Sequence, residues 1–230
     1  MDQQRQAKRI LDTLTGPWEK PLLIKMAKAL PLWVTSDRLT VLGIIASFIV
    51  AYGFIALWAS PWWILLSNAG FVIHWWADSL DGTLARVRRL EREKYGYFVD
   101  HICDAIAIVL ICVGLGLSPL VHTGIGLAVA IGYLMMNVYA HVVSYVDHVF
   151  QISYGRFGPT EIRIIFIIST TVFAFWNPGL FHVRSTEFRL ADIIALTVAV
   201  AFVLIFIVSS LKKAVQLDKT DRANWDQPKP

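Results

Sequence analysis

Four aspartates at helical spacing are the residues of this sequence best suited to chemistry. Asp78 and Asp81 are three residues apart and Asp100 and Asp104 are four apart, so in helices each pair projects from one face. A charged turn between the pairs returns the chain to the same depth. We therefore expect four carboxylates to approach one another from two neighbouring antiparallel helices. Their oxygens suit Mg²⁺ or Mn²⁺, and two such ions would clamp a diphosphate and orient attack on it.

The alternative for these acids is a pair of solvated helix ends in which each carboxylate pairs with an adjacent arginine. One charge at the centre of a membrane helix costs about 2.5–3.5 kcal/mol, so four acids near a bilayer need cationic compensation. Gly82 and Ala85 would let a flat base or sugar lie against the helix backbone. Arg86 is placed for a phosphate or an internal carboxylate. Together these residues favour a metal-dependent site over solvated helix ends.

Long apolar runs must position the acids. Of the 230 residues, 56% are hydrophobic and 17% are charged, whereas a soluble domain carries about a quarter charged residues. The runs approach the roughly 20 residues that a helix needs to cross a bilayer. We predict an all-α membrane protein with six transmembrane helices, at residues 39–59, 62–77, 98–117, 125–145, 162–176 and 190–209. The second and fifth runs are short, so we expect their helices to extend into the flanking polar segments.

A further short helix is predicted at residues 22–30, between Pro21 and Pro31. Lys25 and Lys28 share one face of it, which is typical of an N-terminal interfacial amphipathic helix, with a soluble cap helix as the alternative. The predicted division is an N-terminal cytoplasmic segment with this helix (1–37), a six-helix transmembrane catalytic domain (38–211) and a cytoplasmic polar tail (212–230).

Basic residues set the expected orientation. They concentrate before the first span, between the second and third, and after the sixth, which with six spans all lie on one side. The positive-inside rule makes that side cytoplasmic, and the four aspartates share it. The formal net charge of +4 is explained by basic loops that face the cytoplasm and anionic lipid. We therefore expect no nucleic-acid partner.

The motif around the aspartates resembles a family signature. The pattern D-x-x-D-G-x-x-A-R, nine residues, then G-x-x-x-D-x-x-x-D is similar to that of the CDP-alcohol phosphotransferase family. It is filled here by Asp78, Asp81, Gly82, Ala85, Arg86, Gly96, Asp100 and Asp104. The resemblance implies a homodimeric membrane enzyme whose site opens to the cytoplasmic leaflet and whose four aspartates hold two divalent ions. It also implies that Gly82, Ala85, Arg86 and Gly96 contribute to binding the CDP group.

A second segment, from Ser36 to Gly43, resembles the family's P-N-x-L-T-x-x-G pattern at the start of the first span. Thr40 fits this pattern, whereas Ser36 and Asp37 replace proline and asparagine. The resemblance assigns Asp37 and Thr40 to CDP binding, with Asp37 accepting from the cytosine amine. Helix capping by Ser36 or Asp37 is the alternative.

The general base has two candidates. His101 follows Asp100 directly, and at neutral pH it can take a proton from an attacking hydroxyl. A similar Asp-His pair occurs in the choline and ethanolamine phosphotransferase branch, whereas many other members assign the role to the residue matching Asp104. A histidine that is only hydrogen-bonded at the interface is the third interpretation.

Other polar residues are candidates for the acceptor or head group. Asn137, His141 and Tyr145 are spaced four residues apart in the fourth span and would line the acceptor's path or bond neighbouring helices. Glu161 would bind a substrate amine or hydroxyl, or would stabilise the N-terminus of the fifth span.

The predicted function is metal-dependent transfer of a substituted phosphate from a CDP-alcohol to a hydroxyl acceptor, with release of CMP, in phospholipid synthesis. We favour a CDP-choline or CDP-ethanolamine donor with a lipid hydroxyl acceptor. The alternative is CDP-diacylglycerol with a small polyol or amino-alcohol acceptor, so at least one substrate is a lipid. A cation transporter is a third alternative, but its acids would be expected near mid-membrane. We expect the plasma membrane of a bacterium rather than the endoplasmic reticulum.

Overall fold

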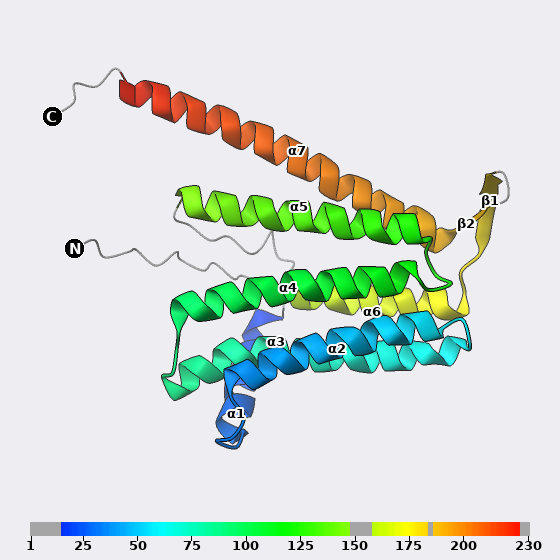
Figure 1. Ribbon diagram of the computed structural model, residues 1–230, viewed down its shortest axis with the longest axis horizontal. Helices are drawn as coiled ribbons and strands as arrows, with labels where there is room; N and C mark the ends of the chain where they lie inside the picture. Colours follow the sequence, from blue (N-terminus) through cyan, green and yellow to red (C-terminus); the bar gives the residue numbers. More distant parts are fainter. Residues whose placement is uncertain (1–14, 148–157, 184–185, 226–230) are drawn as a thin grey trace.

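A computed structural model describes residues 15–147, 158–183 and 186–225. Long helices lie roughly side by side in this structure, with a short helix and a small hairpin at opposite ends (Figure 1). The elements in chain order are α1 (Gly16–Ala29), α2 (Ser36–Ala56), a 3-10 turn (Pro61–Trp63), α3 (Ile64–Arg88), α4 (Glu93–Gly116), α5 (Thr123–Asp147), α6 (Pro159–Phe175), β1 (Gly179–Val183), β2 (Thr186–Arg189) and α7 (Leu190–Trp225).

Each of the six predicted spans corresponds to one helix, from α2 to α7, and the all-α class is confirmed. Two helices run well past the predicted apolar limits. Helix α3 continues from residue 77 to Arg88, and α7 continues from residue 209 to Trp225. The added turns are charged and polar. Apolar composition predicts which part of a helix meets lipid, but not where its backbone hydrogen bonds end.

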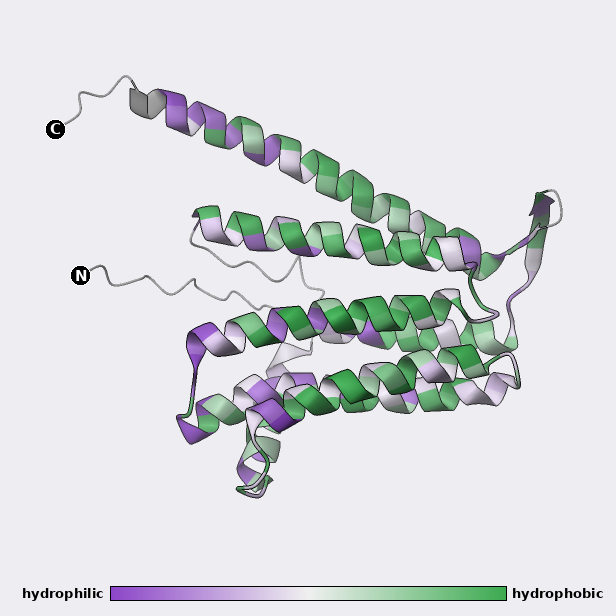
Figure 2. Ribbon diagram, in the orientation of Figure 1, coloured by the Kyte–Doolittle hydropathy of each residue, from purple (hydrophilic) through white to green (hydrophobic). Residues whose placement is uncertain are grey.

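Four helices, α2, α4, α5 and α7, are long and apolar enough to cross a membrane, and the chain is an integral membrane protein. Figure 2 shows their hydrophobic residues concentrated along the middle of the bundle, with hydrophilic residues toward the end where α3 passes into α4. Helix α3 does not fall in this group, and neither does α6, which has 17 residues. Six spans therefore stay a prediction.

Small residues let α2 pack closely against α3 and α4. Gly114 of α4 lies against Ala51 of α2, where a Cβ atom on Gly114 would stand 2.7 Å from the Ala51 Cβ. Gly53 of α2 meets Ser67 of α3 in the same way, and the Ser67 hydroxyl donates to the Val50 carbonyl at 3.0 Å. Such contacts replace the hydrophobic effect as the means of joining helices in lipid. They fix the helices that carry the aspartates.

Helix α1 packs across α3. It buries Leu23 and Ala27 against Leu80 and Leu84, while Trp18 and other large apolar side chains stay exposed. The helix begins at Gly16 and runs through Pro21, which the sequence analysis expected to bound it. The amphipathic pattern is therefore present in a packed helix, and its place in a membrane interface stays a prediction.

A short hairpin of β1 and β2 closes the end opposite to α1, and the sequence analysis did not predict it. Asp192, at the start of α7, is 1% exposed and anchors this end. Its carboxylate accepts from the His122 amide at 2.7 Å and from the Arg189 amide at 3.0 Å. The hairpin thus caps the bundle at its far end.

The Gly114–Ala51 contact generates a stability prediction. Gly114→Ala would force α4 away from α2 and should lower the melting midpoint of the detergent-solubilised protein by about 5 °C, since overpacking costs about 1–3 kcal/mol. The matched control is Gly124→Ala, because a Cβ atom there meets nothing within 4 Å. Equal midpoints for the two variants would contradict the close packing.

Candidate active site

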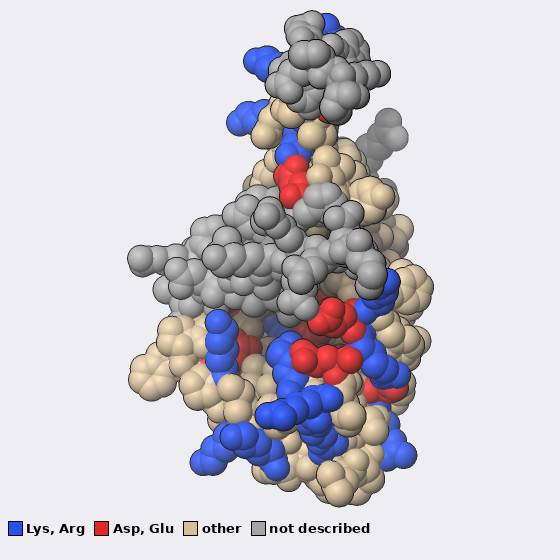
Figure 3. All heavy atoms as spheres, turned by 90° about the vertical axis from the view of Figure 1, so that its left-hand side faces the viewer, with Lys and Arg blue, Asp and Glu red and all other residues tan. Residues whose placement is uncertain are grey.

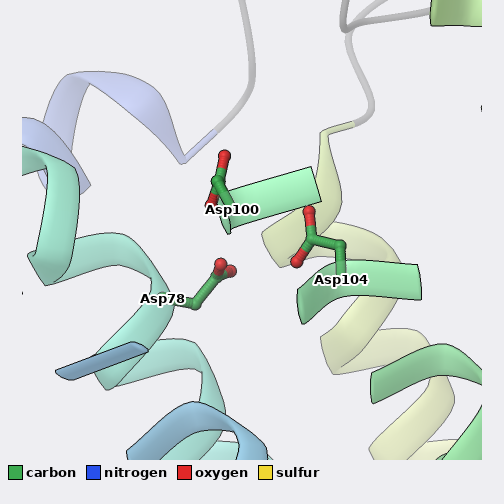
Figure 4. Close-up of side chains that lie close together, drawn as sticks. All are labelled: Asp78, Asp100 and Asp104. Carbon is green, nitrogen blue, oxygen red and sulfur yellow. The ribbon is translucent and has the colours of Figure 1, made fainter. Parts of the chain in front are cut away.

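Three aspartates from two helices converge in the half of the bundle nearer to the turn between α3 and α4. Asp78 comes from α3, and Asp100 and Asp104 come from α4 (Figure 4). Each offers a carboxylate oxygen, and these oxygens all lie within 4.8 Å of one another. All-oxygen donors at this separation fit a hard divalent cation. The expected approach of acids from two neighbouring helices is therefore present for three of the four.

The fourth aspartate, Asp81, turns toward α2. Its Oδ2 accepts from the Thr40 hydroxyl at 2.8 Å, and its backbone carbonyl accepts from the Ser36 hydroxyl at 2.7 Å. Asp81 is thus outside the group of three, although it lines the same pocket. Neither Ser36 nor Asp37 caps α2, because the Thr35 side chain accepts from the Arg38 amide.

The pocket that the acids line is small. Its cavity measures about 20 Å³, and α2, α3 and α4 supply its walls: Thr40, Gly43, Ile44, His74, Asp78, Asp81, Asp100, Cys103 and Asp104. A water molecule needs about 10–15 Å³ measured this way, so the cavity has room for an ion or a water-sized group but not for a nucleotide. A nucleotide would have to bind across its opening.

Arg163 of α6 contacts the group of three acids directly. Its Nη2 lies 3.3 Å from Asp78 Oδ2, and both side chains are partly buried. This contact brings α6 to the site formed by α3 and α4.

The arginines in the sequence motif have other contacts. The Arg86 guanidinium lies over Gly82 on its own helix and donates to the Thr83 hydroxyl at 3.0 Å. Arg88 donates to the Val34, Leu30 and Pro31 carbonyls, which joins the turn after α1 to α3. These contacts hold the charged end of α3 in place.

Three further residues predicted to bind the CDP group lie beside this end. Asp37 forms an ion pair with Arg92, and both side chains are about half exposed. Ala85 is half-buried on α3, and Gly96 has open space around its Cα in the first turns of α4. Figure 3 shows acidic and basic side chains gathered on this end of the bundle.

His101 is held in a stack of rings. Its centroid lies 4.1 Å from that of Tyr97, one turn earlier on α4, and 4.3 Å from that of His141 on α5. His101 Nδ1 is 3.5 Å from Asp100 Oδ2. The stack fixes the imidazole beside the acids, as a general base would require.

The fourth predicted span, with its three polar residues Asn137, His141 and Tyr145, corresponds to α5. Of these residues, His141 contacts His101. Asn137 is half-buried on the same helix, whereas Tyr145 is 82% exposed and lies outside the pocket lining. Equal spacing on one helix thus does not give these residues a common role, because His141 contacts His101 whereas Tyr145 is exposed.

Glu161 is buried in a network that joins α6 to the start of α1. Its carboxylate accepts from the Thr15 amide at 2.8 Å, the Thr15 hydroxyl at 3.0 Å and the Gly158 amide at 2.9 Å. Next to it, the Thr160 hydroxyl donates to Glu19, which also accepts from the Trp75 indole. These contacts favour the helix-terminus interpretation of Glu161 over binding of an acceptor.

The sequence analysis did not single out His74 or Cys103, which both line the pocket. The spacing contained a signal for His74, which precedes Asp78 by four residues and so shares its helix face. Cys103 lies between Asp100 and Asp104, and only the packing against α2 shows that it reaches the cavity wall.

Comparison with known proteins agrees with the motif. Cholinephosphotransferase 1 of Danio rerio is 28% identical over 173 residues, which are 69% of this chain and 43% of that protein. The Homo sapiens protein of the same name is 28% identical over 154 residues, covering 64% and 37%. The Gallus gallus protein is 27% identical over 175 residues, covering 71% and 50%. The chain thus spans half or less of the length of these relatives.

The family model described as CDP-alcohol phosphatidyltransferase matches residues 33–205. That range includes the four aspartates and every helix from α3 to α6. The chain belongs to the CDP-alcohol phosphatidyltransferase family.

Proposed function

We propose that this chain transfers a substituted phosphate from a CDP-alcohol to a hydroxyl acceptor and releases CMP, as a step in phospholipid synthesis. The observation that carries the proposal is the convergence of Asp78, Asp100 and Asp104 within the family signature. A cation transporter would be expected to place its acids on broken helices, whereas these acids lie on the unbroken helices α3 and α4.

The proposed donor is CDP-choline or CDP-ethanolamine, and the proposed acceptor is a lipid hydroxyl. The relatives named cholinephosphotransferase support this choice, as does the Asp100-His101 pair. The alternative is CDP-diacylglycerol with a small polyol or amino-alcohol acceptor.

The proposed cofactor is a pair of Mg²⁺ or Mn²⁺ ions held by the four aspartates. The site fits, because the converging donors are carboxylate oxygens, which are the ligand atoms that such hard cations prefer. When bound, such ions polarise a diphosphate and offset the charge that develops on its oxygens. Thr40 supports this role by orienting Asp81 through a 2.8 Å hydrogen bond.

In the proposed reaction, the acceptor oxygen attacks the phosphorus that carries the non-nucleotide alcohol. His101 takes the hydroxyl proton, with Asp104 as the other candidate base. Tyr97 stacks on the His101 ring and the tilted ring of His141 lies against it, so both hold the imidazole in place. The bond from phosphorus to the bridging oxygen breaks, and CMP leaves with that oxygen.

The nucleotide would lie over the opening of the cavity, because the cavity itself is too small to hold it. Gly82 and Ala85 offer a surface without large side chains for the base or sugar. Arg86, Asp37, Thr40 and Gly96 surround this surface in the proposal. Arg86 and Asp37 would exchange their present contacts with Thr83 and Arg92 for the ligand.

We further propose that α2 to α7 are six membrane spans, with the active site at the cytoplasmic side. The basic segments near the α3–α4 turn support this orientation. The family resemblance supports a homodimer. We also keep the proposed division into a cytoplasmic N-terminal segment (1–37), a transmembrane catalytic domain (38–211) and a cytoplasmic tail (212–230). The bacterial plasma membrane stays a prediction, and the relatives named above come from vertebrates.

The first prediction concerns metal dependence. Asp100→Asn removes a carboxylate charge from the group of three and should lower Mg²⁺- or Mn²⁺-dependent CMP release at least a hundredfold. Wild-type release should stop on addition of EDTA. Asp218→Asn is the matched control, because Asp218 pairs with Arg222 on the exposed part of α7. Full metal-dependent turnover by Asp100→Asn would overturn the proposed mechanism.

The second prediction concerns the donor. Purified protein supplied with Mg²⁺ and diacylglycerol should release CMP from CDP-choline or CDP-ethanolamine. CDP-diacylglycerol supplied with glycerol 3-phosphate, inositol or serine should give at least tenfold less. The opposite ratio would establish the alternative donor and leave the reaction class intact.

The third prediction concerns the ring stack. His141→Ala should lower kcat about tenfold and leave the donor KM nearly unchanged, because the His101 ring loses a contact that orients it. His141→Phe restores a ring at this position and should recover most of the rate. His182→Ala, an exposed histidine on β1, is the control. Equal rates for His141→Ala and wild type would show that the stack does not orient the base.

A further inference from the structure

His74 is a buried polar side chain whose ring has an unused hydrogen-bonding atom. It is 7% exposed, it lines the same pocket as the aspartates, and its Nδ1 has no hydrogen-bond partner within the described residues. A buried donor or acceptor without a partner destabilises the fold, and an apolar side chain of similar size would avoid that penalty. Packing alone therefore does not account for a histidine at this position.

The position of His74 on α3 directs it to the reacting groups. It precedes Asp78 by four residues, so the two side chains share one face and stand about one helical turn apart. Asp78 and Arg163 are both close enough to act on the imidazole electrostatically. His74 thus belongs to the inner wall of the pocket, beside the acid that Arg163 contacts.

A role as a metal ligand does not fit the geometry. Both imidazole nitrogens count as potential ligand atoms, yet among the described residues the group whose ligand atoms lie within 4.8 Å of one another contains only Asp78, Asp100 and Asp104. The hard cations that suit those carboxylates also prefer oxygen to imidazole nitrogen. A polar group on a bound ligand is therefore the partner expected for Nδ1.

The size of the cavity limits that group. About 20 Å³ is far below the volume of a nucleotide or an alcohol head group, so only a small part of a ligand, such as a phosphoryl oxygen, enters the cavity. Because the pocket also contains the acids proposed to hold the diphosphate through metal ions, a phosphoryl oxygen is the ligand atom expected there.

Resting on the proposed function, we propose that His74 is a donor-binding residue whose Nδ1–H donates a hydrogen bond to a phosphoryl oxygen of the CDP-alcohol diphosphate. It would fix that oxygen from the inner side while the nucleotide lies across the opening. A hydrogen bond to a charged group has a large effect on affinity when its partner is removed.

The experiment measures the affinity of the purified full-length protein for CDP, by calorimetry with Mn²⁺ present and without a lipid acceptor. CDP is the probe because both candidate donors contain its diphosphate. His74→Leu should weaken CDP binding between about tenfold and a hundredfold. His74→Asn places an amide N–H near the position of Nδ1 and should stay within about threefold of wild type. Ser67→Ala, a buried change on the same helix that removes an internal hydrogen bond, should not change the affinity.

Mn²⁺ affinity without nucleotide, followed by electron paramagnetic resonance, should be the same in wild type and His74→Leu. Loss of Mn²⁺ binding in His74→Leu would overturn the proposal in favour of a metal ligand. Unchanged CDP affinity in that variant would overturn it as well. If His74→Leu does not fold, His74→Asn is compared with His74→Gln, because Gln places its amide near the position of Nε2 instead of Nδ1. The His74→Asn variant should bind CDP about tenfold more tightly than the His74→Gln variant. Equal affinities of these two variants would refute the assignment of Nδ1 to the phosphoryl oxygen. A wild-type protein that binds no CDP would instead refute the proposed function itself.

Discussion

The mutual repulsion of carboxylates inside a membrane bundle is the constraint on which the rest of this structure depends. Asp78, Asp100 and Asp104 would separate if their helices were free to move, because like charges in a partly buried site repel strongly. Rigid packing elsewhere keeps them together. Gly114 against Ala51 and Gly53 against Ser67 allow α2 to hold α3 and α4 at short distance. A divalent ion would then turn a repulsive arrangement into a binding site.

Contacts around the acid end add to this rigidity. Arg88 binds three carbonyls of the turn between α1 and α2, and Glu161 joins the first turn of α6 to Thr15. Arg163, two residues after Glu161, reaches Asp78 from α6. Helices α1, α2, α3 and α6 are thereby connected by polar contacts near the site, whereas the opposite end relies on a core of aromatic and aliphatic side chains. The polar contacts are short in range and directional, which suits a site that must keep its geometry.

Much of the architecture was predictable from the sequence, because apolar runs and helical spacing depend on local information. The positions of α2 to α7 and the approach of Asp78 to Asp100 and Asp104 follow from these patterns. The orientation of Asp81 was not predictable, since the spacing of two acids on α3 does not show that Thr40 of α2 offers one of them a hydrogen bond. Glu161 and His74 illustrate the same limit. Glu161 accepts two hydrogen bonds from Thr15, which is far away in sequence, and the pocket position of His74 depends on α2 and α4. Residue type and spacing identify a face of a helix, but the neighbouring helix decides what that face meets.

Helix α7 has a consequence for how the protein sits in a bilayer. Its 36 residues extend about 54 Å, well beyond the hydrocarbon thickness of about 30 Å. If Leu190 lies near one boundary, about 20 residues bring the helix to the other boundary close to Lys213, which pairs with Asp147 at the end of α5 at 2.6 Å. This ion pair is most stable at the level of the lipid head groups, so it favours one depth in the membrane for both α5 and α7. Sliding α5 or α7 along the membrane normal would draw the pair into hydrocarbon, so the pair opposes a change in the height of the bundle relative to the lipid surface.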